Sequence, residues 1–240
     1  GELPCGIFRL LHHPFSDRHR TLRGHRGIAG GPAEAGDQVR HRLQQRRRSG
    51  EGFGEMSRSF HKLYRKRLVR GKYRDEARPI LVNNWEGTYF DFTGDKIYEI
   101  AEKAASCGIE MLVLDDGWFG VRNSDDCSLG DWVDNVEKTG GLKNLADRIK
   151  SLGMKFGLWV EPEMISPKSD IFEAHPEYAQ AIPGVEPIER RWQLCMDLCN
   201  PEVLEYLSDV LIKLFKETGV DYVKWDHNRS MSDVYSKCLD

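Results

Sequence analysis

Short apolar runs alternate with longer amphipathic stretches along most of this 240-residue chain. Apolar residues spaced three or four positions apart predict helices over four ranges: 95–107, 142–152, 167–178 and 200–219. Runs with the composition of β-strands fall before, between and after these helices: 80–85, 111–116, 156–161, 193–197 and 221–226. Strands that alternate with helices predict an α/β fold with a parallel sheet, so we expect all five strands to lie parallel.

The helix expected after residue 200 has the clearest boundary signals. Asn200 is a favourable N-cap, Pro201 suits the first turn, and Glu202 lies near the positive end of the helix dipole. Gly219 follows the last apolar position of the stretch, and glycine is the residue that most often ends a helix. These signals predict a helix that begins after Asn200 and ends at Gly219.

The first fifty residues differ in composition from the rest of the chain. They contain ten arginines, five histidines and no lysine, whereas residues 51–240 contain eleven arginines, fourteen lysines and three histidines. They show no sustained apolar period, so we expect an irregular or disordered basic segment over residues 1–50. A nucleic-acid-binding arm and a segment translated out of frame are the alternatives. Residues 51–78 are expected to form a helical lead-in, with helical spacing over 56–69.

Composition narrows the class of protein. The formal net charge of −3 gives no electrostatic reason to expect nucleic acid or an anionic membrane as a partner. No apolar run approaches the roughly 20 residues that span a bilayer, and no signal-peptide core begins the chain. The six cysteines form no C-x-x-C pair, which favours free thiols in a reducing compartment. We therefore expect a cytoplasmic protein with no membrane partner.

Polar and aromatic residues gather where the expected strands end. The first three strands close as NNWE, DDGW and WVEPE, the fourth carries Asp197, and the fifth closes as KWDHNR. A parallel α/β barrel builds its active site at these carboxyl ends. Carboxylates that follow strands can instead be helix N-caps, but that does not explain the accompanying Trp, Lys and Asn. The pattern therefore predicts a site at this end of the sheet.

The residue types at these ends suit a sugar. Carboxylates accept hydrogen bonds from hydroxyls, Lys, Arg and Asn donate them, and a Trp face covers the apolar side of a sugar ring. The competing use is a Mg²⁺ site, for which oxygen ligands are available: Asp115, Asp116, Glu161 and Glu163. No histidine cluster lies beside these carboxylates, and Lys224 near Asp226 would oppose a cation. The sequence therefore favours a sugar site without a metal.

Asp226 is the strongest candidate for a reactive carboxylate. It lies two residues after Lys224, and alternation along a strand places both side chains on the same side. A nearby ammonium favours the ionised carboxylate and lowers its pKa, as a glycosidase nucleophile requires. A buried structural ion pair would have the same spacing. The choice between these two readings stays open on spacing alone.

Four motifs resemble the family 36 glycoside hydrolases, the bacterial α-galactosidases. They are ILVNNWEGTYFDF, LVLDDGWFG followed by SLGDW, GLKNLADRIKSLGMKFGLWVEPEM and YVKWDHNR. They occur in the family's order and at similar spacing, and together they cover about three quarters of the chain. The resemblance implies a (β/α)₈ TIM barrel and retaining hydrolysis of terminal α-D-galactosyl residues through a galactosyl-enzyme intermediate. It implies substrates such as melibiose and raffinose-type oligosaccharides, and no metal or organic cofactor.

The resemblance also assigns residue roles. It implies that Asp226 is the nucleophile. The galactose-binding positions it implies are Trp85, Asp115, Asp116, Trp159, Lys224 and Asn228. It also places an arginine before the fourth strand, and Arg191 and its neighbour Arg190 compete for that place. The segment ERRWQLCMDL departs from the family's more usual Arg-Asn-Gln pattern here.

Two departures from the family concern the extent of the chain. Residues 1–50 do not resemble the β-sandwich domain that precedes the family's barrel. The family's general acid/base aspartate follows a Cys-Ser-Gly-Gly-Gly-type strand end, which the 240 residues do not contain. We therefore expect residues 79–240 to be the N-terminal part of a TIM-barrel catalytic domain, with about five of eight strands and without the acid/base carboxylate.

Other functions remain open at this stage. An inactive sugar-binding remnant, a related α-N-acetylgalactosaminidase and a galactosyl transferase would each share these motifs. The motifs do not decide the exact substrate or whether the full-length protein is a homo-oligomer.

Overall fold

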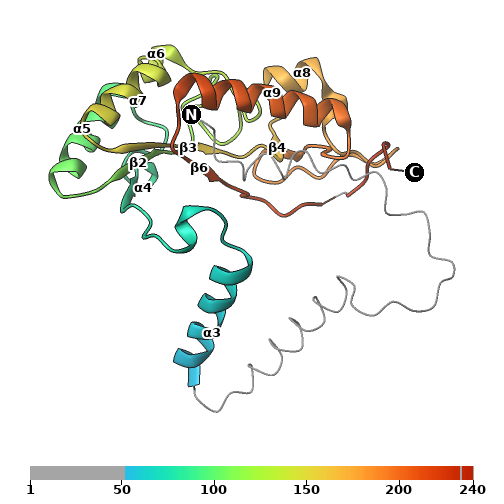
Figure 1. The fold of residues 1–240 in the computed structure, drawn as a ribbon. Coiled ribbons are helices and arrows are strands. Elements are labelled where there is room, and N and C mark those ends of the chain that lie inside the picture. The colour runs from blue at the N-terminus through green and yellow to red at the C-terminus, as the bar shows by residue number, and fades with distance from the viewer. Residues whose placement is uncertain (1–51, 233, 240) are drawn as a thin grey trace. The chain divides into compact units, whose positions relative to one another are not determined.

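The computed structural model describes residues 52–232 and 234–239, so the interpretations of residues 1–50 fall outside it. The chain divides into two compact units, residues 1–78 and 79–240. Within the described residues, the second unit contains all the strands (Figure 1). The candidate site residues also belong to it, since their numbers run from 85 to 228.

The described part of the first unit is helical. Helix α3 spans Gly52–Arg67 and is followed by the 3₁₀ turn η1 over Lys72–Arg74. Glu55 lies in the first turn of α3 and three basic residues lie in its last turn, which complements the helix dipole at both ends. The predicted helix over 56–69 is present. No residue of α3 is buried.

The second unit is built on four parallel strands in the order β1-β2-β3-β6. Their bounds are Leu81–Asn83, Met111–Leu114, Lys155–Val160 and Tyr222–Trp225. Each parallel connection passes through helical segments, as a crossover between parallel strands requires (Figure 1). Four of the five expected strands are therefore confirmed, with the parallel direction that the alternating pattern predicts.

The fifth expected strand, 193–197, does not belong to this sheet. Its core is β5, Leu194–Cys195, which pairs antiparallel with β4, Met164–Ile165. Strand β6 pairs directly with β3, with Gly157 opposite Tyr222, so no place between them remains for residues 193–197. The expectation of five parallel strands is wrong. The alternating run instead forms one strand of a small two-stranded antiparallel sheet, and both strands of this sheet lie in the long connection between β3 and α9.

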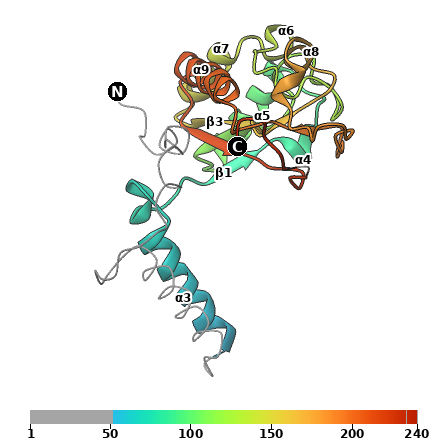
Figure 2. The same cartoon turned by 90° about the vertical axis from the view of Figure 1, so that its right-hand side faces the viewer.

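Three helices cover one side of the parallel sheet (Figures 1 and 2). They are α5 (Gly94–Ser106), α7 (Leu142–Ser151) and α9 (Pro201–Thr218). As the boundary signals predict, the Asn200 side chain accepts the Glu202 N–H, and Gly219 ends α9 in the left-handed conformation. Shorter helical segments lie in the connections: α4 (Trp85–Thr88), α6 (Val136–Thr139), α8 (Asp170–Ala174) and η2 (Pro176–Tyr178).

The core lies between the helices and the sheet. Strand β2 is buried along its whole length, and the helices contribute the apolar faces that their periodicity predicts. Each large apolar side chain that becomes fully buried contributes about 1.5–3 kcal/mol. Four aromatic residues extend this core toward the carboxyl ends of the strands, each at most 2% exposed: Trp118, Phe119, Trp132 and Trp159. These four packed aromatic side chains therefore form the part of the core that is nearest to the candidate site.

Candidate active site

Lys224 connects the ends of two strands across the sheet. Its Nζ lies 2.7 Å from Asp115 Oδ2 and 3.6 Å from Asp226 Oδ2. Asn83 also donates its side-chain amide to Asp115 Oδ2, at 2.5 Å. Burial disfavours the ammonium, but Asp115 and Asp226 outweigh it, so the pKa of Lys224 is raised. The shared side of Lys224 and Asp226, predicted from their spacing, is confirmed by the short distance between their charged groups.

The Asp226 carboxylate is held by several donors and stays partly open to solvent. Its Oδ2 accepts the Trp159 indole N–H at 2.9 Å, and its Oδ1 accepts the His227 backbone N–H at 3.0 Å. Partial burial works to raise its pKa, but hydrogen bonds from Trp159, Asn228 and His227, together with the charge of Lys224, lower it. The side chain remains 29% exposed. It is therefore an ionised and accessible carboxylate.

Trp159, the indole donor to this carboxylate, is part of the buried core. It is 1% exposed, and its ring is stacked against that of Phe119 with centroids 6.1 Å apart. The Trp118 indole donates to the Trp159 carbonyl at 3.0 Å. In the structure, the polar edge of Trp159 therefore orients Asp226 while its faces pack in the protein. Its direct contact with a sugar stays a prediction.

Asp116 faces a buried arginine that the sequence analysis missed. Arg122 donates through Nε to Asp116 Oδ1 at 3.0 Å and through Nη2 to Asp116 Oδ2 at 2.8 Å. Both side chains are almost fully buried, and Arg122 Nη1 also donates to the carbonyls of Asp125 and Cys127. Burial raises the pKa of Asp116, and the guanidinium opposes that rise. Because Arg122 lies in a loop without a strand-end pattern, its sequence position gave no signal.

Asn228 joins the ends of β3 and β6. Its backbone N–H donates to Glu161 Oε1, and its side-chain Nδ2 donates to Glu161 Oε2 at 3.2 Å. Glu161 is fully buried, and burial raises its pKa. Two residues further on, Glu163 accepts the Trp225 indole N–H at 2.8 Å. The sequence showed Glu161 only as a potential metal ligand, and its link to Asn228 was not foreseen.

Two predicted site residues lie at the margin of this cluster. Trp85 begins α4, is half-buried, and packs edge-on against the rings of Tyr89 and Phe90. Arg191 has a positive φ of 52° and donates to Asp125 Oδ1 at 3.3 Å. In the described part of the chain, no hydrogen bond joins Arg191 to Asp115 or Asp226. The binding role of Arg191 therefore stays a prediction.

The carboxylates at the ends of β2, β3 and β6 are paired with cationic or amide side chains. Among the described residues, no group of three or more His, Cys, Asp or Glu side chains is arranged to hold a metal ion. Within the same residues, no helix is both long and apolar enough to cross a membrane. What the arrangement provides chemically is one accessible, ionised carboxylate beside hydrogen-bond donors and acceptors.

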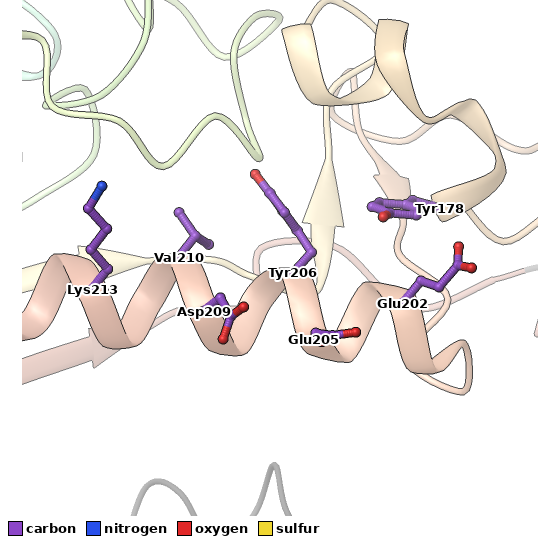
Figure 3. A pocket seen from close by; sticks show the side chains of 7 residues that line it. All are labelled: Tyr178, Glu202, Glu205, Tyr206, Asp209, Val210 and Lys213. Carbon is purple, nitrogen blue, oxygen red and sulfur yellow. The ribbon is translucent and has the colours of Figure 1, made fainter.

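A surface hollow on helix α9 is separate from this cluster (Figure 3). Its lining residues are Tyr178, Glu202, Glu205, Tyr206, Asp209, Val210 and Lys213. None of them is a strand-end residue. The hydroxyl of Tyr206 donates to the Gly130 carbonyl at 2.9 Å, which fastens the helix to the loop after β2.

Comparisons with known proteins agree with the motifs. The Melibiase family model matches residues 46–240. The bifunctional α-galactosidase/sucrose kinase AgaSK of Mediterraneibacter gnavus is 49% identical over 189 residues, which are 78% of this chain and 20% of that protein. The α-galactosidase AgaA of Geobacillus stearothermophilus is 47% identical over 192 residues, 80% of this chain and 26% of that protein. The chain thus spans about a quarter or less of these relatives.

Solved structures show the same likeness. The crystal structure of the GH36 α-galactosidase AgaA from Geobacillus stearothermophilus matches with a TM-score of 0.74 and 48% identity, covering 77% of this chain and 26% of that one. The galactosidase domain of AgaSK matches with a TM-score of 0.72, covering 75% and 25%. The expected α/β class and partial (β/α)₈ barrel are confirmed, with four parallel strands in place of five. The chain belongs to the Melibiase family, the family 36 glycoside hydrolases that its motifs resemble.

Proposed function

We propose that this chain carries the nucleophilic half of a retaining α-galactosidase site, with Asp226 as the nucleophile. The observation that supports this most is the state of Asp226, which is partly exposed and lies 3.6 Å from the Lys224 ammonium. Its pKa is lowered even though burial opposes the charge. A carboxylate with these properties is ready to attack an anomeric carbon.

The proposed step forms one bond and breaks another. A lone pair of the Asp226 carboxylate bonds to the anomeric carbon, while the glycosidic C–O bond breaks and its electrons leave with the aglycone oxygen. Retaining enzymes place a second carboxyl group about 5–5.5 Å away to protonate that oxygen. The motif that would supply this acid has no counterpart in the 240 residues. The proposal therefore assigns to this chain nucleophilic attack but not acid catalysis.

The neighbouring groups are assigned to galactose. Asp115 and Asp116 accept hydrogen bonds from hydroxyls, and Lys224 and Asn228 donate them. Since Arg122 occupies one side of each Asp116 oxygen, the remaining lone pairs are the ones available to a sugar. Trp159, which donates to Asp226, and the marginal positions Trp85 and Arg191 complete the proposed binding set.

The substrate class is proposed from the relatives. Crystal structures of variants of the Geobacillus enzyme AgaA are of complexes with stachyose and with raffinose. We extend this class, terminal α-galactosides, to the protein to which this site belongs. A cytoplasmic location and the division of the chain into residues 1–50, 51–78 and 79–240 are part of the same proposal.

Covalent labelling tests the proposal. A nitrophenyl α-galactoside has a good leaving group, so attack on it needs little acid assistance. The 240-residue chain should acquire the mass of one galactosyl group slowly and should not turn over melibiose. Asp226→Asn should abolish the labelling, whereas Asp209→Asn, an exposed carboxylate on α9, should leave it unchanged.

Two outcomes would contradict the proposal. Labelling that persists in Asp226→Asn would show that another group is the nucleophile. Galactose binding without any labelling would instead support the sugar-binding remnant. Circular dichroism on each variant checks that the sheet and helices are retained.

A further inference from the structure

Glu161 is a buried carboxylate with no assigned part in the proposed reaction. It follows the last residue of β3 and is 0% exposed. Both of its oxygens accept N–H groups of the same residue: Oε1 accepts the Asn228 backbone N–H, and Oε2 accepts Asn228 Nδ2 at 3.2 Å. Burying a carboxylate costs free energy unless donors satisfy it, so this pair of bonds is the main local compensation.

Asn228 is placed between two carboxylates. Its side-chain Nδ2 donates to Glu161 Oε2 at 3.2 Å, and the residue lies two positions after Asp226, whose pKa its side chain helps to lower. An ionised carboxylate can only accept hydrogen bonds, whereas an amide has a donating nitrogen and an accepting oxygen. The amide can serve both neighbours only if its nitrogen, which carries two hydrogens, faces them. In the opposite orientation the amide oxygen would face Glu161 and Asp226, and both carboxylates would repel it.

We infer that Glu161 is a positioning residue, which fixes the side-chain amide of Asn228 so that its nitrogen faces the Asp226 carboxylate. The backbone bond to Asn228 strengthens this effect, because it holds the segment after β6 against the end of β3. The Asp226 N–H donates to the Val160 carbonyl at 2.8 Å, so the two strand ends are joined on both sides of the carboxylate. The inference rests on the proposed function in one respect only, which is the role of Asp226 as the nucleophile.

Two effects of Glu161 on Asp226 have opposite signs. As a negative charge, Glu161 disfavours ionisation of Asp226. As the group that directs an Asn228 donor to Asp226, it favours ionisation. The other charged or titratable groups near Asp226 are Lys224 and His227 on its own segment. At the end of β2, Asp115 shares the Lys224 ammonium with Asp226, and Asp116 raises the pKa of Glu161. They stay the same when only Glu161 is changed.

Glu161→Gln separates the two effects. Glutamine is nearly isosteric but offers one accepting oxygen where glutamate offers two, so one Asn228 N–H loses its partner and meets an NH₂ group. The amide of Asn228 or its backbone then turns, and the bond to Asp226 weakens. The titration midpoint of Asp226, followed by NMR of ¹³C-labelled aspartate carboxyls and assigned with Asp226→Asn, should rise by the order of one pH unit.

Two further variants complete the test. In the background of Asn228→Ala, the Glu161→Gln change should no longer raise the midpoint, because the connecting amide is gone. Glu163→Gln is the matched control: it removes a nearby charge whose partner is the Trp225 indole, and it should not raise the midpoint. A midpoint that stays or falls in Glu161→Gln alone would overturn the inference and leave only a charge effect.

A measurement on the unsubstituted chain keeps the inference testable if Glu161→Gln does not fold. The Asn228 side-chain NH₂ resonances should respond to the titration of both Glu161 and Asp226. A response to Asp226 alone would overturn the inference. Neither NMR measurement depends on galactosyl transfer, so failure of the inference is distinguishable from failure of the proposed function.

Discussion

The ends of β2 and β6 both carry an aspartate beside a cation, but the two pairs differ in burial. Asp116 and Arg122 have side chains that are 7% and 1% exposed, and two hydrogen bonds join them in parallel. Asp226 and Lys224 are 29% and 35% exposed, and their charged groups lie 3.6 Å apart. The first pair is closed to solvent, whereas the second leaves part of its carboxylate open.

The difference has consequences for the pKa of each aspartate. At Asp116 burial dominates and raises the pKa despite the guanidinium. At Asp226 hydrogen bonds from Trp159 and its neighbours, with the Lys224 charge, outweigh a smaller loss of hydration and lower the pKa. A closed ion pair and the open carboxylate that we propose as the nucleophile can thus both consist of an aspartate beside a cation. Solvent exposure and the number of donors distinguish them.

Breaking the buried pair should have the largest effect on stability. Arg122→Met leaves the Asp116 carboxylate buried without its partner and removes the bonds to the carbonyls of Asp125 and Cys127. The free energy of unfolding should fall by about 3–5 kcal/mol, measured by urea denaturation. Asp226→Asn should change it by no more than about 1 kcal/mol. Equal losses for the two variants would show that the ends of β2 and β6 do not differ as described.

Removing the cation at the open pair should act on reactivity more than on stability. The pKa of Asp226 is lowered, so its ionised form is favoured above the ordinary aspartate pKa and is lost only as the pH falls below that range. Labelling by an activated galactoside should therefore stay constant from neutral pH down to about pH 5. Lys224→Met should raise the pKa of Asp226, move the loss of labelling at acidic pH to higher pH, and slow labelling near pH 4 by about two- to threefold relative to its own rate at neutral pH.

The matched control for this prediction is Lys150→Met. Lys150 pairs with Asp221 at 3.2 Å near the start of β6, far along the strand from Asp226. Removing the Lys150 ammonium should not change the acidic pH at which labelling is lost. If Lys224→Met also left that pH unchanged, the hydrogen bonds to Asp226, and not the ammonium, would determine its ionisation.

A fully exposed pair gives the smallest expected effect. Lys143 and Asp147 lie one turn apart on α7, with side chains 60% and 57% exposed. Lys143→Met should change the free energy of unfolding by less than about 0.5 kcal/mol. A loss comparable to that of Arg122→Met would remove burial as the explanation of the difference between the pairs.

Periodicity predicted α5, α7, α9 and four parallel strands, because burial of one helix face or of a whole strand leaves a local pattern. The single helix expected over 167–178 is wrong: α8 ends at Ala174, and the separate turn η2 begins at Pro176, because a residue before proline disfavours the helical conformation. It did not predict the partner of residues 193–197, since an alternating run has the same appearance in a small antiparallel pair as in the main sheet. Pairing is decided by tertiary structure, where β6 occupies the position beside β3.

The candidate site was predictable where chemistry coincides with strand ends. Asp115 lies in the second motif and Lys224 and Asp226 in the fourth, all at the same edge of a parallel sheet, and the structure brings them together. Arg122 and Glu161 were missed in their structural roles. Arg122 lies in a loop and Glu161 directly follows β3, positions where a charged side chain is usually solvated. Only the three-dimensional structure shows that these two are buried and which groups they bind.

The central claim is that the open carboxylate at the end of β6 faces the anomeric carbon of a bound galactose. A crystal structure of the chain with galactose tests it most directly. We expect the sugar to contact Asp115 and Lys224, with its anomeric carbon about 3–3.5 Å from an Asp226 oxygen. Galactose bound in the hollow on α9, or at the strand ends with its anomeric carbon directed away from Asp226, would contradict the claim.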